Sequence, residues 1–252
     1  MSDIFFEVPK LKLWMQQNII GFKGPIKVKR LTGGQSNPTF LIISSKITYI
    51  LRTKPLGNLL PSAHAVDREY KVISALSKTS VPVPKTYKLC LNKNVIGSIF
   101  YIMEFLDGRI FYDPSLPGLT KNERKSIYSS MNNAISDLHK INYKRIKLSD
   151  FGKAGNYVER QIKRWTAQYR ASETDLIEEM ENLIKWLPDN TPSNLETSLV
   201  HGDFRIDNII FHPTKSKIIG IIDWEISTLG DPIADFAYHV MIWRLSKNEF
   251  RG

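Results

Sequence analysis

The feature that most constrains this 252-residue chain is a pair of acidic motifs separated by two short apolar segments. The first motif is HGDFRIDN, at positions 201–208, and the second is IIDWE, at positions 221–225. Between them, Ile209–Phe211 and Ile218–Ile222 flank the turn-forming run HPTK. Apolar, β-branched segments on either side of such a turn predict a β-hairpin. The second motif is therefore expected directly after a hairpin.

The spacing of the polar residues in these motifs favours phosphoryl-transfer chemistry. Asn208 follows Asp203 by five positions, as in the H-R-D-x-x-x-x-N catalytic loop of protein kinases. Asp223 lies twenty positions after Asp203, where a kinase carries its metal-binding aspartate. The reaction needs a carboxylate beside the attacking hydroxyl and oxygen ligands for Mg²⁺. A lone HGD is common in unrelated proteins, whereas the complete pattern is much rarer.

The chain divides by pattern into a β-rich first half and a mainly helical second half. Residues typical of strands occupy Ile26–Leu31, Thr39–Ile43, Thr48–Leu51, Lys85–Leu91 and Ser98–Phe105. Apolar residues at helical spacing predict helices at Ala65–Leu76, after Thr120, at Tyr157–Tyr169, at Asp175–Leu187 with Pro188 as a stop, and from Asp231 onward. Thr120 and Glu123 form a capping-box pattern at the start of the longest helix.

This order of elements predicts an α+β, two-lobed, protein-kinase-like fold. We expect an N-terminal ATP-binding lobe at residues 1–106 and a C-terminal catalytic and substrate lobe at residues 107–252.

Two weaker signals lie in the first half. Gly33, Gly34 and Ser36 fall between two strands, where a kinase folds a glycine-containing turn over the phosphates. The segment is neither G-x-G-x-x-G nor a Walker A motif, so an ordinary hairpin remains an equal interpretation. Arg52, on the third strand, takes the place of the kinase lysine that holds phosphates, and Glu69 on the next helix is its expected partner. The plain alternative is a surface arginine with an unrelated glutamate.

Other residues near the motifs have structural interpretations. His201 is expected to brace the loop by hydrogen bonding rather than to act as a base. Asp231 and Asp235, four positions apart, share one helix face and are expected to cap the helix and contact the catalytic loop. Trp224 and the other tryptophans are expected in the core or in lobe packing.

Composition excludes several classes of protein. The single cysteine, Cys90, rules out an intramolecular disulfide or a multi-cysteine metal site, and its apolar neighbours predict a buried thiol. No stretch approaches the roughly 20 apolar residues that cross a bilayer, and the N-terminus lacks a signal-peptide pattern. We therefore expect no membrane span and a cytoplasmic location, or a mitochondrial or peroxisomal one in a eukaryote.

The formal net charge of +10 admits an anionic partner. The lysines are nevertheless scattered along the chain, and no nucleic-acid-binding motif is present. We expect a solvated basic surface and no nucleic-acid partner. The sequence sets no oligomeric state.

Several long segments carry a resemblance to a known family. They are LRTKPLGNLLPSAHAVDREYKVI, MEFLDGRIFYDPSLPGL, RQIKRWTAQYRASETDLIEEMENLIKWLP, LVHGDFRIDNIIF and IIGIIDWEISTLGDPIADFAYHV. The chain resembles the aminoglycoside phosphotransferase/choline kinase-like family. It is most similar to the kinase-like N-terminal domain of acyl-CoA dehydrogenase family members ten and eleven and to related bacterial phosphotransferases. The similarity runs from about residue 26 to the end.

The resemblance implies a kinase-like fold with ATP and Mg²⁺ as cofactors. It implies Asp203 as catalytic base, Asn208 and Asp223 as metal ligands, and Arg52 with Glu69 as the phosphate-side pair. It also implies Glu104, Phe105 and Leu106 as the adenine-binding connector. The implied acceptor is the hydroxyl of a 4-hydroxy acid carried as its coenzyme A thioester. Members of the family usually continue for several helices, so the C-terminal lobe is expected to be truncated.

Other functions stay open at this stage. An aminoglycoside or another metabolite is an alternative acceptor, and Asp175, Glu178, Glu179 and Glu181 supply some acidity that a polycation would need. A catalytically silent, kinase-like binding module is a second alternative, although Asp203, Asn208 and Asp223 are all kept. A protein-substrate kinase is disfavoured, because the segment from Asp223 to Asp231 is too short for an activation loop.

Overall fold

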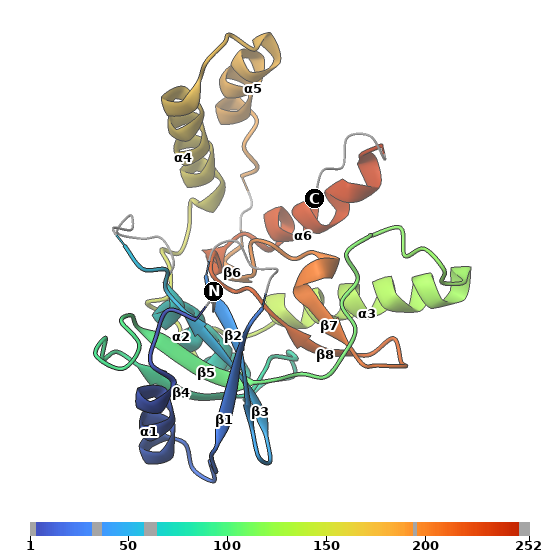
Figure 1. Cartoon of the computed structure of the whole chain (residues 1–252). Coiled ribbons are helices and arrows are strands. Elements are labelled where there is room, and N and C mark those ends of the chain that lie inside the picture. The colour runs from blue at the N-terminus through green and yellow to red at the C-terminus, as the bar shows by residue number, and fades with distance from the viewer. Residues whose placement is uncertain (1–3, 32–36, 58–64, 194–195, 247–252) are drawn as a thin grey trace. The chain divides into compact units, whose positions relative to one another are not determined.

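A computed structural model describes residues 4–31, 37–57, 65–193 and 196–246 of the chain (Figure 1). The chain folds into two compact units. The first comprises the residues up to Ala134 together with Arg205–Glu225, and the second comprises Ile135–Phe204 and the residues from Ile226 onward.

The first unit is built on a five-stranded antiparallel sheet (Figure 1). The strands, in spatial order, are β1 (Ile26–Arg30), β2 (Thr39–Ser44), β3 (Thr48–Thr53), β5 (Phe100–Glu104) and β4 (Thr86–Cys90). Arg52 of β3 is paired with Thr39 of β2 on one side and with Tyr101 of β5 on the other. Arg52 therefore lies on the central strand of the sheet.

The alternation of side chains along the strands gives the sheet two different faces. On one face, buried apolar residues of β2, β3 and β5 form a cluster with Leu11 and Met15 of helix α1 (Val8–Asn18). The buried thiol of Cys90 belongs to the same cluster, as the sequence predicts. Ile50 and Arg52 alternate with the residues of this cluster and point to the opposite face. Helix α2 (Val66–Leu76) of the first unit lies on this opposite face and contacts β4 and β5.

A small hairpin completes the first unit. It consists of β7 (Ile209–Phe211) and β8 (Ile218–Ile221), and it follows the short 3₁₀ helix η1 (Ile206–Asn208). Phe211 forms an isolated antiparallel bridge with Arg109, and the backbone N–H of Ile221 donates to the carbonyl of Pro82 at 2.8 Å. A Cβ atom on Gly108 would lie 2.3 Å from the carbonyl oxygen of Phe211, so this approach requires glycine.

These hydrogen bonds explain why the compact units do not follow the division at residue 106 that the sequence suggested. Because the hairpin bonds to the segments around Pro82 and Arg109, residues 205–225 cluster with the first unit. The assignment of lobes as 1–106 and 107–252 stays a prediction.

The second unit is mainly helical. Its helices are α4 (Tyr157–Ser172), α5 (Glu178–Asp189), α6 (Pro232–Met241) and the 3₁₀ helix η2 (Ile242–Arg244), and its strands β6 (Ser198–Val200) and β9 (Thr228–Gly230) form a two-stranded sheet. Helix α3 (Lys121–His139) begins in the first unit and ends in the second. Its predicted capping box is confirmed, because the Thr120 N–H donates to Glu123 Oε2 at 2.8 Å and the Glu123 N–H donates to Thr120 Oγ1 at 3.3 Å.

The predicted strands and helices are confirmed to within a few residues at their ends, but three expectations were wrong or incomplete. Helix α1 and the strands β6 and β9 were not predicted. Pro188 lies inside the last turn of α5 instead of stopping the helix before it. Trp224 is buried, whereas Trp165, Trp186 and Trp243 are 57–63% exposed and so do not belong to the core.

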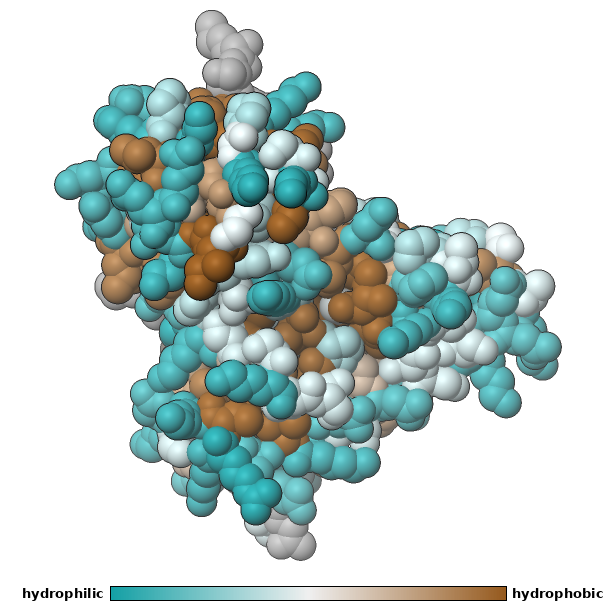
Figure 2. All heavy atoms as spheres, turned by 90° about the horizontal axis from the view of Figure 1, so that it is seen from below, coloured by the Kyte–Doolittle hydropathy of each residue, from teal (hydrophilic) through white to brown (hydrophobic). Residues whose placement is uncertain are grey.

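Polar residues cover much of the surface. Figure 2 shows one face on which hydrophilic side chains predominate and apolar side chains form smaller, separated groups. The helices in the described part of the chain are all too short or too polar to cross a lipid bilayer.

Candidate active site

The loop that carries Asp203 follows directly after β6 and is held by buried side chains of the second unit. His201 is fully buried, and its Nδ1 atom accepts a hydrogen bond from the backbone N–H of Asp203 at 3.2 Å. This contact confirms that His201 braces the loop. Gly202 adopts φ 86°, and an added Cβ would lie 3.1 Å from the side chain of Ile226. The turn therefore requires glycine for both its backbone conformation and its packing.

Asp235 of α6 fixes the same loop from the other side. Its Oδ2 accepts the backbone N–H of His201 at 2.9 Å, and its Oδ1 accepts the backbone N–H of Gly202 at 2.8 Å. His139 Nε2 lies 2.9 Å from Oδ2. Burial alone would raise the pKa of Asp235, but the hydrogen bonds from His139 and the two backbone groups hold that pKa below its ordinary value. Asp235 is therefore a buried carboxylate that organises the loop.

Helix α6 presents one functional face to this loop. Asp231 is its N-cap and accepts the backbone N–H of Ala234 at 2.9 Å, as expected from the sequence. Asp235 lies one turn further on, and Tyr238 lies a further turn along the same face. The hydroxyl of Tyr238 donates to Oδ1 of Asp203 at 2.9 Å. Sequence reasoning missed Tyr238, although the spacing 231, 235, 238 was visible in DPIADFAY.

The first unit holds a second polar cluster, centred on Arg52. Its Nε lies 3.0 Å from Glu69 Oε2, and its Nη2 lies 2.5 Å from Asp223 Oδ1 and 3.8 Å from Glu225 Oε2. Arg52 is 9% exposed and Glu69 is 1% exposed. The predicted pairing of Arg52 with Glu69 is therefore present, and it extends to Asp223. Glu225 was not predicted as a member of this cluster.

One guanidinium serves three carboxylates in this cluster, and the pKa values of Arg52 and Glu69 reflect both their burial and these charged neighbours. Burial alone would lower the pKa of Arg52, but the neighbouring carboxylates, Glu69 foremost, raise it above its ordinary value. Burial raises the pKa of Glu69 to about 7; the guanidinium of Arg52 opposes this rise, while Asp223 and Glu225 reinforce it. The cluster consequently has surplus negative charge that a bound cation would balance.

Asp223 and Asn208 are held as neighbours by the backbone. The N–H of Ile222 donates to the carbonyl of Asn208 at 2.9 Å, so a residue of the first motif is paired with a residue of the second across the hairpin base. Asp223 adopts φ 66°, a left-handed conformation that turns the chain sharply after β8. Trp224 follows Asp223 directly, and its indole N–H donates to the carbonyl of Ile221 at 2.8 Å, which fixes the chain after the turn.

The donors around Asp223 fit a magnesium ion. Within the described ranges, no set of three or more His, Cys, Asp or Glu side chains is arranged to bind a metal alone. Mg²⁺ is usually held by one or two carboxylates with other oxygen ligands, and substrate phosphates complete its coordination. The carboxylate of Asp223, the side-chain oxygen of Asn208 and the surplus negative charge satisfy that requirement.

The remaining predicted residues are divided between described and undescribed parts of the chain. Glu104 ends β5; its Oε2 accepts the backbone N–H of Lys85 at 3.1 Å. Phe105 is 39% exposed, and the side chain of Leu106 packs closely over Gly220 of β8. Gly33, Gly34 and Ser36 lie outside the described residues. Just beyond that segment, Asn37 is buried and its Nδ2 donates to Glu225 Oε2 at 3.0 Å.

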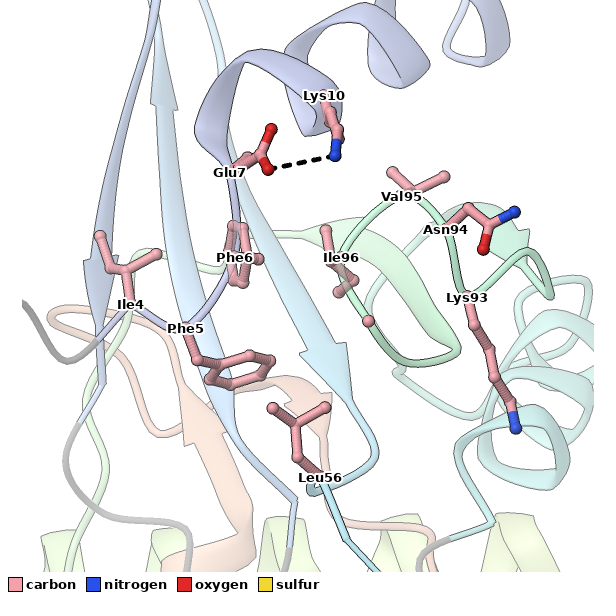
Figure 3. A pocket seen from close by; sticks show the side chains of 11 residues that line it. Ile4, Phe5, Phe6, Glu7, Lys10, Leu56, Lys93, Asn94, Val95 and Ile96 are labelled. Atoms are coloured by element: carbon pink, nitrogen blue, oxygen red, sulfur yellow. Dashed lines mark hydrogen bonds and ion pairs between the residues drawn. The ribbon is translucent and has the colours of Figure 1, made fainter.

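A pocket of about 540 Å³ in the first unit lies apart from these residues (Figure 3). Its walls come from the segment before α1, from Leu56 after β3 and from the loop between β4 and β5. Glu7 and Lys10 form an ion pair of 3.1 Å at one side (Figure 3). None of the described residues predicted for the site lines this pocket.

Comparison with known proteins decides the family. The sequence model of the phosphotransferase enzyme family matches residues 27–250. The chain belongs to the phosphotransferase enzyme family. The resemblance read from the sequence is thereby confirmed, and the motifs around Asp203 and Asp223 lie inside the matched region.

Curated relatives of this phosphotransferase are much longer proteins. Acyl-CoA dehydrogenase family member 10 of Mus musculus is 48% identical over 222 residues, which cover 88% of this chain and 21% of the relative. Acyl-CoA dehydrogenase family member 11 of Homo sapiens is 40% identical over 243 residues, which cover 94% of this chain and 31% of the relative. The chain thus spans about a fifth to a third of the length of these relatives.

Solved structures give the fold of the phosphotransferase. A "putative aminoglycoside phosphotransferase" of Ralstonia eutropha is 47% identical, with a TM-score of 0.89 over 98% of this chain and 73% of that chain. APH(2″)-IIa, in a ternary complex with streptomycin and ATP, is 20% identical, with a TM-score of 0.65 over 94% of this chain and 77% of that chain. The second likeness concerns the fold alone. The predicted α+β, kinase-like fold is confirmed.

Proposed function

We propose that this chain transfers the γ-phosphate of MgATP to a hydroxyl group of a small molecule. The observation that carries the proposal is that hydrogen bonds and ion pairs hold both acidic motifs in place. The Asp203 loop is fixed by Asp235, and five positions later Asn208 lies beside Asp223 and the buried Arg52 cluster. Membership of the phosphotransferase family supports the reaction type, and the ATP bound by APH(2″)-IIa supports the nucleotide.

In this proposal Asp203 accepts the proton of the attacking hydroxyl. The acceptor oxygen forms a bond to the γ-phosphorus while the bond to the β,γ-bridging oxygen breaks, and ADP leaves. Two backbone hydrogen bonds to Asp235 keep the Asp203 loop in place, so that its carboxylate needs little rearrangement.

Asn208 and Asp223 would hold Mg²⁺ through their side-chain oxygens. When bound, the ion neutralises charge on the phosphate oxygens. Arg52 contacts Asp223 at 2.5 Å and Glu69 at 3.0 Å, so it orients the metal-binding carboxylate as well as offering positive charge to phosphate. Glu69 in turn fixes the Arg52 guanidinium.

The adenine and triphosphate contacts stay predictions. Glu104, Phe105 and Leu106 follow β5 and are proposed to line the adenine site. Gly33, Gly34 and Ser36 are proposed to lie over the phosphates. GTP in place of ATP is the alternative that a nucleotide comparison tests directly.

For the acceptor, we favour a 4-hydroxy acid carried as its coenzyme A thioester. The support is the 40–48% identity to segments of acyl-CoA dehydrogenase family members 10 and 11, whose names place them with acyl-CoA substrates. An aminoglycoside or another metabolite is the second candidate, supported by the fold of the aminoglycoside phosphotransferases. Of the acidic residues on α5 that would suit a polycation, Glu181 is already paired with Arg170.

The test is transfer of labelled γ-phosphate by the purified chain. Wild type, Asp203→Asn and Asp189→Asn are incubated with labelled MgATP or MgGTP and with 4-hydroxyacyl-CoA, aminoglycosides and amino alcohols. Asp189 is an exposed acid at the end of α5 and serves as the matched control. Transfer to one acceptor by wild type and the control, with Asp203→Asn reduced at least about 100-fold, supports the proposal. Bound nucleotide without transfer to any acceptor favours a kinase-like binding module.

A further inference from the structure

The hydroxyl of Tyr238 forms a hydrogen bond with one oxygen of the proposed catalytic carboxylate. It donates to Oδ1 of Asp203 at 2.9 Å, which is within the ordinary range for an O–H···O hydrogen bond. The two residues are 35 positions apart in sequence but belong to the same compact unit. The contact is therefore a feature of the tertiary fold and does not arise from local chain geometry.

The tyrosine is held in place by its helix. Asp231 caps the first turn of α6, and Asp235 binds the loop one turn later through two hydrogen bonds, so Asp235 fixes the register of α6 relative to the Asp203 loop. Tyr238 extends this face by one further turn. Its side chain is 37% exposed, so the ring is only partly covered and the hydroxyl is the polar group that meets the loop.

We propose that Tyr238 is a positioning residue for the phosphoryl transfer. By donating to Oδ1, it fixes the plane of the Asp203 carboxylate, which receives the proton of the acceptor hydroxyl. A carboxylate attached through one rotatable bond has a broad torsional range, and a hydrogen bond to one of its oxygens narrows that range. This inference rests on the proposed function, since it assigns Asp203 the part of proton acceptor.

A competing arrangement has a different outcome. A hydroxyl bound to Asp203 could block the place of the acceptor hydroxyl instead of orienting the carboxylate. Removal of the Tyr238 hydroxyl would then relieve the block and lower the acceptor KM or raise kcat. If Tyr238 positions Asp203, the same change lowers kcat. The two arrangements therefore predict changes of opposite sign.

The first experiment is steady-state kinetics of Tyr238→Phe with MgATP and the acceptor that wild type phosphorylates. The phenyl ring is kept, so packing is retained and only the hydroxyl is lost. We expect kcat to fall about tenfold or more, which is the order expected for one hydrogen bond to a charged group, while the KM for ATP changes less than about twofold. Tyr112→Phe, at a site 74% exposed in the first unit, is the matched control and should behave as wild type. An unchanged kcat, a raised kcat or a lowered acceptor KM in Tyr238→Phe overturns the proposal.

A second measurement does not depend on activity. 3-Fluorotyrosine is placed at position 238 and its ¹⁹F resonance is recorded with and without Asp203→Ala. We expect the resonance to shift on loss of the carboxylate, whereas 3-fluorotyrosine at position 112 should not respond. An unshifted resonance at position 238 overturns the contact itself. If the contact is present but wild type transfers phosphate to no acceptor, the proposed function fails, and the positioning role fails with it.

Discussion

Replacing Asp235 by asparagine should destabilise the protein although the two side chains have nearly the same shape. The carboxylate accepts two backbone N–H groups, from His201 and Gly202, and lies 2.9 Å from His139 Nε2. It is 4% exposed, so water cannot replace these partners. In the asparagine variant one oxygen becomes an NH₂ group, which must face a hydrogen-bond donor.

The magnitude follows from the number of bonds. A hydrogen bond to a charged group contributes on the order of 1.5–3 kcal/mol, and a buried group left unsatisfied costs about 1–3 kcal/mol. One of the two oxygens of Asp235 is lost as an acceptor, and the other loses its charge. We expect the free energy of unfolding at pH 7 to fall by roughly 3 kcal/mol, out of the 5–15 kcal/mol typical of a folded protein.

The effect should depend on pH with a definite sign. The pKa of Asp235 is lowered on folding from its ordinary value of 3.8, so its contribution to stability is present above that value. The contribution is lost as pH falls through the lower pKa of the folded state. The difference between wild type and Asp235→Asn should therefore be largest near neutral pH and should shrink below about pH 4.

Urea unfolding followed by circular dichroism measures this difference at a series of pH values. Asp189→Asn, at an exposed position, is the control and should change the free energy of unfolding by less than about 0.5 kcal/mol. An Asp235→Asn protein within 0.5 kcal/mol of wild type at pH 7 would refute the reasoning, because it would mean that the carboxylate is not required by its donors. If the loop is loosened as expected, phosphate transfer should fall together with stability.

Three further changes test other parts of the structure. Arg52→Lys should weaken MgATP binding measured by calorimetry at least about tenfold, because a single ammonium cannot reach Glu69 and Asp223 in the way that the guanidinium does; unaltered affinity would contradict this. The pKa of Glu69 is raised to about 7, so its contribution to stability is present below its ordinary value of 4.5 and lost as pH rises through 7. Glu69→Gln should accordingly flatten the fall of the free energy of unfolding between pH 5 and 8, and an unchanged slope would show that Glu69 is ionised throughout. Thr120→Ala should lower the free energy of unfolding by about 1 kcal/mol through loss of the capping box with Glu123, and a change below 0.3 kcal/mol in urea titrations would argue against it.

Sequence reasoning succeeded where a pattern is local. Strands such as β2 and β3 have the residue types typical of strands, and the start of α3 is marked by a capping box four residues long. It failed where an element is too short or too weakly patterned. Strands β6 and β9 have three residues each, and α1 buries only Leu11 and Met15. None of these three elements gives a periodic signal long enough to recognise.

The candidate site was predicted to the extent that its residues form compact motifs. Asp203, Asn208 and Asp223 were found because their spacing is set by one loop and one hairpin. Glu225 and Tyr238 were not, because their partners lie far away in the sequence. Glu225 accepts from a residue 188 positions earlier, and Tyr238 donates to one 35 positions earlier. Such pairings depend on how the chain folds back: the spacing 231, 235, 238 places Tyr238 on one helix face but does not identify its partner.

The single face of α6 has a consequence for other chains of this family. The loop at residues 201–203 contains no helix or strand of its own, and its geometry is imposed by a helix some thirty positions later. Inserting or deleting one residue between Asp231 and Tyr238 would rotate the later positions by about 100° around the helix axis and detach them from the loop. Such a change would act as an active-site mutation while leaving HGD intact. If Asp203 and Tyr238 have the roles proposed above, the pattern D-x₃-D-x₂-Y after the second acidic motif is a better criterion for phosphate transfer than HGD alone.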